Sequence, residues 1–351
     1  MRRLIIQITA IIGLVTGSPS LTAAQGDEIE SPGITEIIRK HLPEGSEGGL
    51  AMLVIKDNTI LHSKGYGTRN GAVPITPQTQ LPLASVTKQF AAMCAAMLIE
   101  EGKLSMTDKV SKHVPGMRPK DGARELMVQD LVWHVSGLPN FIDAKEKASI
   151  DQYKAKHGLE RLTNETHADW LSTMPRRRAP GLEFEYTNSG YVLLARIVEL
   201  VAGMPFHEFQ QQRIFDVLGM TRTKDSKTFN GSGNMMTTLE DYAKWDRALW
   251  GESLLKDQAT KQLFQSGQFD NGETVGYAFG WLVEHDDAEL IETSHGGFGS
   301  PPASARNFVL RDIKNRVTVA LFAQRNLAFN KSVRRAFAEE VRDFVIKPTP
   351  R

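Results

Sequence analysis

The segment Ser85-Val86-Thr87-Lys88 spaces a serine and a lysine as in a catalytic pair. It follows Pro82 and precedes a long apolar run, which predicts that a helix begins here. Three residues make about one helical turn, so both side chains would lie on one face within hydrogen-bonding reach. A lysine whose pKa is lowered by burial can take the proton of a serine hydroxyl and make it a nucleophile. A helix start also offers backbone N–H groups to an oxyanion.

Taken alone, this pair has a second interpretation. Ser-x-x-Lys occurs by chance in many chains, and a capping serine followed by a solvated lysine has the same spacing. Other segments must therefore supply the rest of a catalytic site.

Tyr186 and Asn188 suit the same chemistry. They follow a Pro180-Gly181 turn and precede an apolar segment that predicts a helix over residues 191–202. On an irregular loop, both side chains would point into one cleft, the phenol to transfer a proton and the amide to bind the lysine or the substrate. The structural alternative is an aromatic plug and an Asx turn before the helix.

The third segment, His295-Gly296-Gly297-Phe298, lies at the end of a predicted strand. Two consecutive glycines let a ligand approach the backbone closely and leave N–H groups for a substrate carbonyl. A histidine with an ordinary pKa of about 6.5 is mostly neutral at pH 7, so it would bind a carboxylate poorly. A strand-end histidine that makes only a structural hydrogen bond is the alternative.

The elements that must position these groups follow from the apolar pattern. Helical periodicity dominates residues 81–264, whereas strand patterns occupy the two ends of the chain. We therefore expect an α/β (α+β) domain whose largely antiparallel sheet comes from both ends, about 30–80 and 265–351, with an inserted helical subdomain. The site would lie in the cleft between them. The expected strands are 49–56, 59–63, 277–284, 289–293, 305–310 and 316–323, and the expected terminal helices are 34–41 and 331–346.

The first residues have the pattern of a secretory signal. Two arginines, a short apolar stretch over 4–15 and a small-residue cleavage site predict a signal peptide over 1–24, with 25–351 as the mature domain. The apolar stretch falls short of the roughly 20 residues that span a bilayer, and no second candidate span follows. We expect a bacterial protein of the periplasm or the exterior, without a stable membrane anchor after cleavage.

Charge and cysteine content exclude several function classes. Two of the 42 basic residues lie in the signal, which leaves 40 against 41 acidic residues and no indication of nucleic-acid binding. Cys94 is the only cysteine, which excludes an internal disulfide and a cysteine-based zinc site, and we expect it to be a buried thiol. The nine histidines form no metal-binding pair, so neither metal nor cofactor is expected. The sequence leaves the oligomeric state open.

In chain order, Ser85-x-x-Lys88, Tyr186-x-Asn188 and His295-Gly296-Gly297 resemble the serine β-lactamase and penicillin-recognising superfamily. The resemblance is to the branch of class C β-lactamases, D-alanyl-D-alanine peptidases and related esterases, and it spans about residues 30–346. Segments 131–139, 231–238 and 277–281 resemble the same branch.

The resemblance implies an acyl-enzyme mechanism on a small ester, amide, β-lactam or peptide. Ser85 would attack the carbonyl while Lys88 and Tyr186 move its proton, and Asn188 would orient the lysine or bind the substrate. The backbone N–H groups of Ser85 and Phe298 would form the oxyanion hole. Many β-lactamases and peptidases have Lys-Thr-Gly where this chain has His295-Gly296-Gly297, which favours an esterase or amidase.

Rival functions remain open. A β-lactamase, a D-alanyl-D-alanine carboxypeptidase or a D-aminopeptidase would use the same groups, and a non-catalytic β-lactam- or peptidoglycan-binding protein would keep the pocket without turnover. An α/β-hydrolase is disfavoured because Gly-x-Ser-x-Gly is absent. Among other residues, we interpret His134 as structural, Arg176-Arg177-Arg178 as a solvated surface run, and Trp133 and Trp281 as core.

Overall fold

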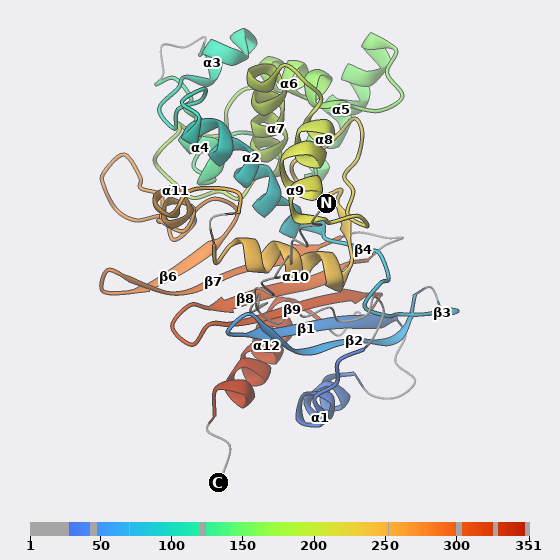
Figure 1. The fold of residues 1–351 in the computed structure, drawn as a ribbon. Helices are drawn as coiled ribbons and strands as arrows, with labels where there is room; N and C mark the ends of the chain where they lie inside the picture. The colour runs from blue at the N-terminus through green and yellow to red at the C-terminus, as the bar shows by residue number, and fades with distance from the viewer. Residues whose placement is uncertain are drawn as a thin grey trace, which may run out of the picture.

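A computed structural model describes residues 28–42, 48–69, 71–119, 124–251, 253–299, 304–325 and 329–347. The predicted signal peptide lies outside these residues. Figure 1 shows three levels: a helical region, a β-sheet beneath it, and two helices from the chain ends on the opposite face of the sheet.

The sheet has seven strands in the order β3-β2-β1-β9-β8-β7-β6, and every neighbouring pair is antiparallel. β1 pairs with β9 along its whole length, which confirms a sheet built from both ends of the chain. A separate two-stranded pair, β4 with β5, lies within the predicted helical region and was not expected. The strands are β1 (Gly49–Lys56), β2 (Thr59–Arg69), β3 (Val73–Pro74), β4 (Leu81–Pro82), β5 (Met236–Thr237), β6 (Leu282–Asp286), β7 (Glu289–Phe298), β8 (Arg306–Asp312) and β9 (Val317–Gln324).

Helices fill the stretch between β4 and β6, as predicted. Within it lie α2 (Lys88–Glu100), α3 (Val110–His113), α4 (Val128–Val132), α5 (Ala144–His157), α6 (Asn164–Thr173), α7 (Asn188–Ala202), α8 (Phe206–Gln210), α9 (Asp216–Leu218), α10 (Leu239–Ala248) and α11 (Asp257–Gln262). Two short 3-10 helices are η1 (Ala84–Thr87) and η2 (Pro115–Met117), and η3 (Gln211–Phe215) is a short π-helix. The terminal helices are α1 (Pro32–His41) and α12 (Lys331–Ile346), close to the predicted bounds.

Two apolar cores lie on the two faces of the sheet. Successive side chains of β1 point to opposite faces, because a strand alternates with a period of two. Ala51, Leu53 and Ile55 join the large core under the helical region, whereas Leu50, Met52 and Val54 join a smaller core with α1 and α12. β1 is therefore apolar from Leu50 to Ile55. Cys94 and Trp281 are buried in the large core as expected, and Trp133 packs against it half-buried.

The predicted bounds of β2 and β6 were wrong for local steric reasons. β2 continues to Arg69, past its expected end at residue 63; Gly65 allows this because the backbone of Ile75 passes where a side chain would lie. β6 begins at Leu282 rather than at 277, because the chain turns at Gly280, whose φ is 81°. A Cβ at Gly280 would lie 2.7 Å from the backbone of Gln89.

Among the described residues, no single helix is both long and apolar enough to cross a membrane. α7 together with residues 206–218 meets that test only as a pair bent by 77°.

Candidate active site

Ser85 lies in η1, one turn before α2, so the helix proper starts at Lys88 rather than at the serine. Ala84 just before it has a φ of 47°, a left-handed conformation that is unusual for a residue with a side chain. The strand next to β7 holds this turn in place: the side-chain amide of Asn307 on β8 donates to the carbonyls of Pro82 and Leu83 at 2.7 and 2.9 Å. The serine is therefore tied to the sheet.

Lys88 is fully buried and points its ammonium at three oxygens. Nζ lies 2.7 Å from Oδ1 of Asn188, 2.8 Å from the carbonyl of Ser232 and 3.5 Å from Oγ of Ser85. Burial lowers the pKa of Lys88 well below its ordinary value, and no ion pair with a carboxylate offsets this among the described residues. A lysine in this state can accept the proton of Ser85.

Tyr186 closes the other side of the lysine, with its ring centre 4.8 Å from Nζ of Lys88. Its hydroxyl is buried and makes no hydrogen bond at normal distance with a described residue. Burial raises the pKa of the phenol, whereas the nearby Ser85 side chain lowers it. The structure thus brings Ser85, Lys88 and Tyr186 together with a phenol oxygen free to exchange a proton.

Asn188 differs from its expected place on an irregular loop, because it is the first residue of α7. Its backbone N–H donates to Oδ1 of Asn140 at 3.1 Å, and its side-chain amide lies 3.3 Å from the same oxygen. Asn140 therefore satisfies a free N–H at the helix start and turns Oδ1 of Asn188 toward Lys88.

The third segment lies inside β7 rather than beyond its end, because β7 pairs with β8 as far as Phe298. Alternation along the strand sends His295 and Gly297 to the face of η1, and Gly296 and Phe298 to the face of α12. A Cβ at Gly297 would lie 2.5 Å from the carbonyl of Leu83, so only glycine fits there without a shift.

Phe298 does not line the cleft with its side chain. Phe298 is 63% exposed and lies on the α12 face of the sheet. The guanidinium of Arg306 stacks on its ring, with 3.9 Å between the guanidinium carbon and the ring centre. On the same face, Arg334 donates to the carbonyls of Gly297 and Asn307 at 2.7 and 2.9 Å. Only the backbone of Phe298 remains a candidate for contact with a substrate.

His295 is buried beside Tyr277, whose hydroxyl lies 3.0 Å from its Nε2. Burial lowers the pKa of His295 to about 3, and the positive charge of Lys88 acts in the same direction. The expectation of a neutral histidine at pH 7 is therefore strengthened.

Several groups in this site were not indicated by any sequence pattern. The Ser232 carbonyl has no side-chain signature, and nothing in the pattern placed Asn140 or Asn307 beside the catalytic segments. The interpretation of the arginine run as solvated holds for exposed Arg178 but was wrong for Arg177, which pairs with Asp143 and Glu146, each at 2.7 Å. Arg176 also donates to backbone carbonyls.

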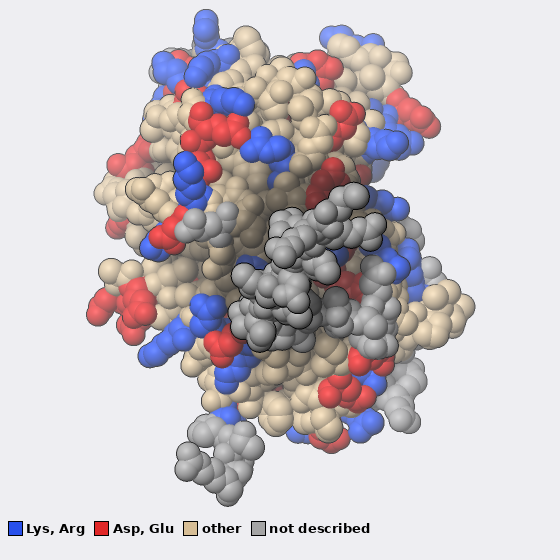
Figure 2. Space-filling view, viewed as in Figure 1, with Lys and Arg blue, Asp and Glu red and all other residues tan. Residues whose placement is uncertain are grey.

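No cluster of three or more histidine, cysteine, aspartate or glutamate side chains suited to a metal occurs in the described part of the chain. Basic and acidic side chains are interspersed over the face seen in Figure 2, without a large area of one sign.

The sequence profile of the family described as Beta-lactamase matches residues 34–342. The chain belongs to the beta-lactamase family. This confirms the resemblance drawn from the three segments. The seven-stranded antiparallel sheet with its helices matches the fold of solved beta-lactamase-like and penicillin-binding-protein-like structures.

Two curated proteins are similar in sequence to this member of the beta-lactamase family. A penicillin-binding protein of Bacillus subtilis (strain 168) is 27% identical over 301 residues, covering 74% of this chain and 63% of the relative. Protein flp of Staphylococcus aureus (strain NCTC 8325 / PS 47) is 28% identical over 292 residues, covering 72% of this chain and 56% of the relative. The chain thus spans less than two thirds of the length of either relative.

Solved structures share the fold at low identity. EstCE1, described as a hydrolase with promiscuous acyltransferase activity, superposes with a TM-score of 0.72 at 18% identity, covering 88% of this chain and 96% of its own. A beta-lactamase/D-alanine carboxypeptidase from Yersinia pestis gives a TM-score of 0.67 at 19% identity, covering 90% and 99%. Family and neighbours are hydrolases of several specificities.

Proposed function

We propose that this protein is a serine hydrolase that cleaves an ester or amide through an acyl-enzyme on Ser85, with carboxylesterase-like preference. The observation that carries the proposal is the placement of Lys88. It is buried, free of any carboxylate partner among the described residues, and within 3.5 Å of the serine oxygen.

The reaction begins with neutral Lys88, aided by Tyr186, taking the proton from Ser85 as Oγ attacks the substrate carbonyl. The backbone N–H groups of Ser85 and Phe298 hold the negative oxygen of the tetrahedral intermediate. The proton then passes through the phenol of Tyr186 to the leaving alcohol or amine, and the carbon–heteroatom bond breaks. Water attacks the acyl-enzyme by the same proton path in reverse, which releases the acid and restores Ser85.

His295 supports an ester over a substrate that carries a carboxylate. With a pKa of about 3, the histidine is neutral at pH 7 and offers no fixed charge where lysine would stand. Peptide C-termini and penicillins carry such a carboxylate.

A β-lactamase or D-alanyl-D-alanine carboxypeptidase is the second candidate, because the family and the curated penicillin-binding relative favour it. The predicted signal over 1–24 would bring either enzyme to the periplasm or the exterior. A non-catalytic binder would bind the same ligands without release.

The experiment compares the mature protein with its Ser85→Ala variant on p-nitrophenyl acetate, p-nitrophenyl butyrate and nitrocefin. We expect ester turnover that Ser85→Ala abolishes, and an acyl adduct on Ser85 by mass spectrometry. Wild-type-like turnover by Ser85→Ala would overturn the nucleophile assignment. Strong nitrocefin turnover with little ester hydrolysis would favour the second candidate, and a stable adduct without turnover would favour the binder.

A further inference from the structure

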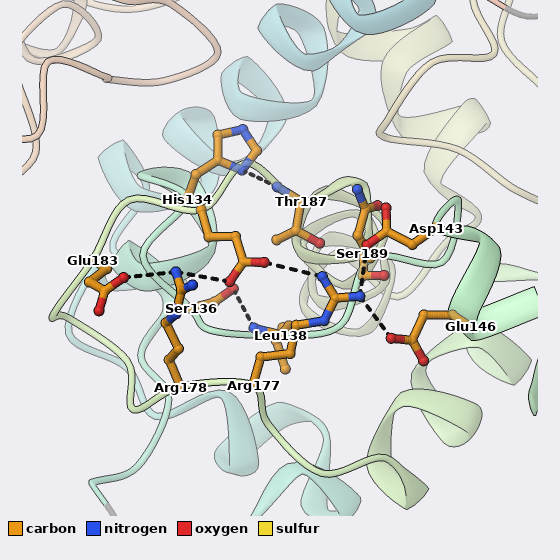
Figure 3. Close-up of polar contacts among 12 residues, drawn as sticks. His134, Ser136, Leu138, Asp143, Glu146, Arg177, Arg178, Glu183, Thr187 and Ser189 are labelled. Carbon is orange, nitrogen blue, oxygen red and sulfur yellow. Dashed lines mark hydrogen bonds and ion pairs between the residues drawn. The ribbon is translucent and has the colours of Figure 1, made fainter.

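His134 holds the backbone on both sides of Tyr186. Its carbonyl accepts the N–H of Glu185 at 2.8 Å, and its ring Nδ1 accepts the N–H of Thr187 at 3.2 Å, as Figure 3 shows for the ring. The two amides that flank the phenol are therefore bound by a single residue. A rotation of the tyrosine backbone would break both bonds.

The imidazole also packs on the tyrosine itself. The ring centres of His134 and Tyr186 are 4.2 Å apart at 35°, and Tyr191 and Tyr277 enclose the imidazole at 4.9 and 4.7 Å. His134 is completely buried. The phenol ring thus has a fixed aromatic surface on one side and the ammonium of Lys88 close by.

The backbone of His134 is in a conformation that needs support. Its φ of 59° is left-handed, which is rare for a residue with a large side chain and persists only where the surroundings impose it. The support is a set of backbone bonds between two loops: Gly181 N–H to the Val135 carbonyl at 2.8 Å and Arg177 N–H to the Gly137 carbonyl at 2.8 Å.

A network of ion pairs holds these loops from outside. The guanidinium of Arg177 contacts the carboxylates of Asp143 and Glu146 at 2.7 Å each (Figure 3). It also contacts the carboxylate of Glu185 at 3.1 Å. Glu185 is the residue whose N–H is bound by His134. The buried imidazole, the ion pairs and the tyrosine therefore belong to one connected unit.

His134 is suited to accept a hydrogen bond rather than to move a proton. Burial lowers the pKa of His134 well below its ordinary value, and a charge on the neighbouring Lys88 or His295 side chain would act in the same direction. Nδ1 must carry no proton to accept from Thr187, so the single proton of the neutral ring lies on Nε2. That nitrogen is buried without a hydrogen-bond partner among the described residues.

We propose that His134 is a positioning residue for Tyr186, which fixes the phenol over Lys88 and Ser85 by binding both flanking amides. This rests on the proposed hydrolase function, in which Tyr186 transfers the proton. It goes beyond the purely structural role that we expected for His134 from the sequence.

The test uses two substitutions that both tolerate a left-handed backbone and both remove the ring. His134→Asn keeps an acceptor near the position of Nδ1, whereas His134→Gly removes it. We expect His134→Gly to lower kcat for p-nitrophenyl butyrate by about 10- to 100-fold, the order of effect of a misplaced catalytic group, with little change in KM. His134→Asn should recover most of that loss.

A double-mutant cycle separates positioning from general stability. In a Tyr186→Phe background, His134→Gly should cause little further loss of kcat, because its effect acts through the phenol. Full additivity would overturn the proposal, as would wild-type kcat in a folded His134→Gly. If His134→Gly does not fold, a folded His134→Asn that loses as much kcat as Tyr186→Phe overturns it.

The control is His62→Gly. His62 is also buried and its Nδ1 also accepts a backbone N–H, that of Ser31 at 3.1 Å, but it lies on β2, separated from β7 by β1, β9 and β8. We expect His62→Gly to lower the melting temperature without lowering kcat.

A readout without turnover distinguishes this proposal from the hydrolase function. The 13Cζ NMR signal of Tyr186, assigned by its loss in Tyr186→Phe, should shift or broaden more in His134→Gly than in His134→Asn, because both variants lose the imidazole 4.2 Å away and only His134→Gly also loses the acceptor. The same signal in the two variants would overturn the positioning role even if no ester were hydrolysed. An active wild type is required only for the hydrolase function.

Discussion

Nζ of Lys88 donates to Oδ1 of Asn188 over 2.7 Å, so the buried ammonium is paired with a neutral amide rather than with a carboxylate. The amide accepts a hydrogen bond without supplying the negative charge that would keep the lysine protonated. This pairing allows burial to lower the pKa of the lysine, as a general base requires.

Asn188→Asp tests this relationship. An aspartate at the same distance stabilises the ammonium and raises the pKa of Lys88, by about one to three units for a close pair. The acidic limb of kcat/KM, where the base becomes protonated, should therefore move to higher pH, and kcat/KM at pH 7 should fall. Asn188→Ala is the control, because it removes the contact without adding charge. An acidic limb of Asn188→Asp at wild-type pH would contradict the assignment of Lys88 as the base.

Gly296 and Gly297 should respond very differently to a single methyl group. A Cβ at Gly297 would lie 2.5 Å from the Leu83 carbonyl, whereas at Gly296 the nearest atom is 3.7 Å away. Gly297→Ala must displace the turn that carries Ser85, and we expect kcat/KM to fall by about 10-fold or more. Gly296→Ala should remain close to wild type. Equal activities of the two variants on p-nitrophenyl butyrate would show that this contact does not position the serine.

Acid should weaken the fold through buried neutral histidines. The pKa of His167 is lowered by burial to about 3, from an ordinary 6.5. Below pH 6.5 the unfolded chain gains a proton that the folded chain does not, so the free energy of unfolding falls as pH drops from about 6.5 to 3. One such group contributes about 1.4 kcal/mol per pH unit in the middle of this window.

His167→Phe isolates this contribution, because the ring lies among Phe141, Trp170 and Phe229 and an aromatic replacement suits that site. Urea unfolding at pH 7 and pH 5 should show a smaller loss of stability on acidification for His167→Phe than for wild type. The same pH dependence in both proteins would mean that His167 takes up its proton in the folded state.

The buried pair of Asp246 and Arg311 should be costly to break from one side. Nε of Arg311 lies 3.0 Å from Oδ1 of Asp246, both side chains are 1% exposed, and the guanidinium packs 4.4 Å from the ring centre of Trp250. Asp246→Ala leaves an unpaired cation in the core, which typically costs about 3–5 kcal/mol. Chemical denaturation measures the loss.

The matched control is Asp257→Ala, which breaks the exposed pair with Lys261 at 2.7 Å. A solvent-exposed pair of this kind contributes about 0.5 kcal/mol or less. Comparable losses in Asp246→Ala and Asp257→Ala would show that the Arg311 site admits water.

The general plan of the molecule could be predicted from local patterns. The apolar run Leu50 to Ile55 of β1 and the helical periodicity after Ser85 are local signals, and local signals determine where strands and helices form. The order of the three catalytic segments then indicated the family. Whether the three segments meet in one site depends on the tertiary structure. Their residue types alone already favoured a serine hydrolase over the other classes of enzyme.

The site groups that no sequence pattern indicated escaped prediction because their roles depend on the backbone or on the tertiary structure. The Ser232 carbonyl acts through its backbone, which every residue has, so no sequence pattern can single it out. Asn307 and Asn140 act across about 220 and 50 positions of chain, a relationship that only the folded register creates. The left-handed backbone of His134 is imposed by its neighbours, against the preference of the residue itself.

The pairing of β1 with β9 also affects how the molecule can be made. During synthesis, the apolar strand Gly49–Lys56 leaves the ribosome some 260 residues before Val317–Gln324, the partner that covers its second edge. Until then the growing chain carries an incomplete sheet in which this apolar strand is an unpaired edge strand, and such edges are prone to aggregate. Chaperones that hold nascent chains should therefore matter more for this protein than for one whose sheet is assembled from neighbouring strands.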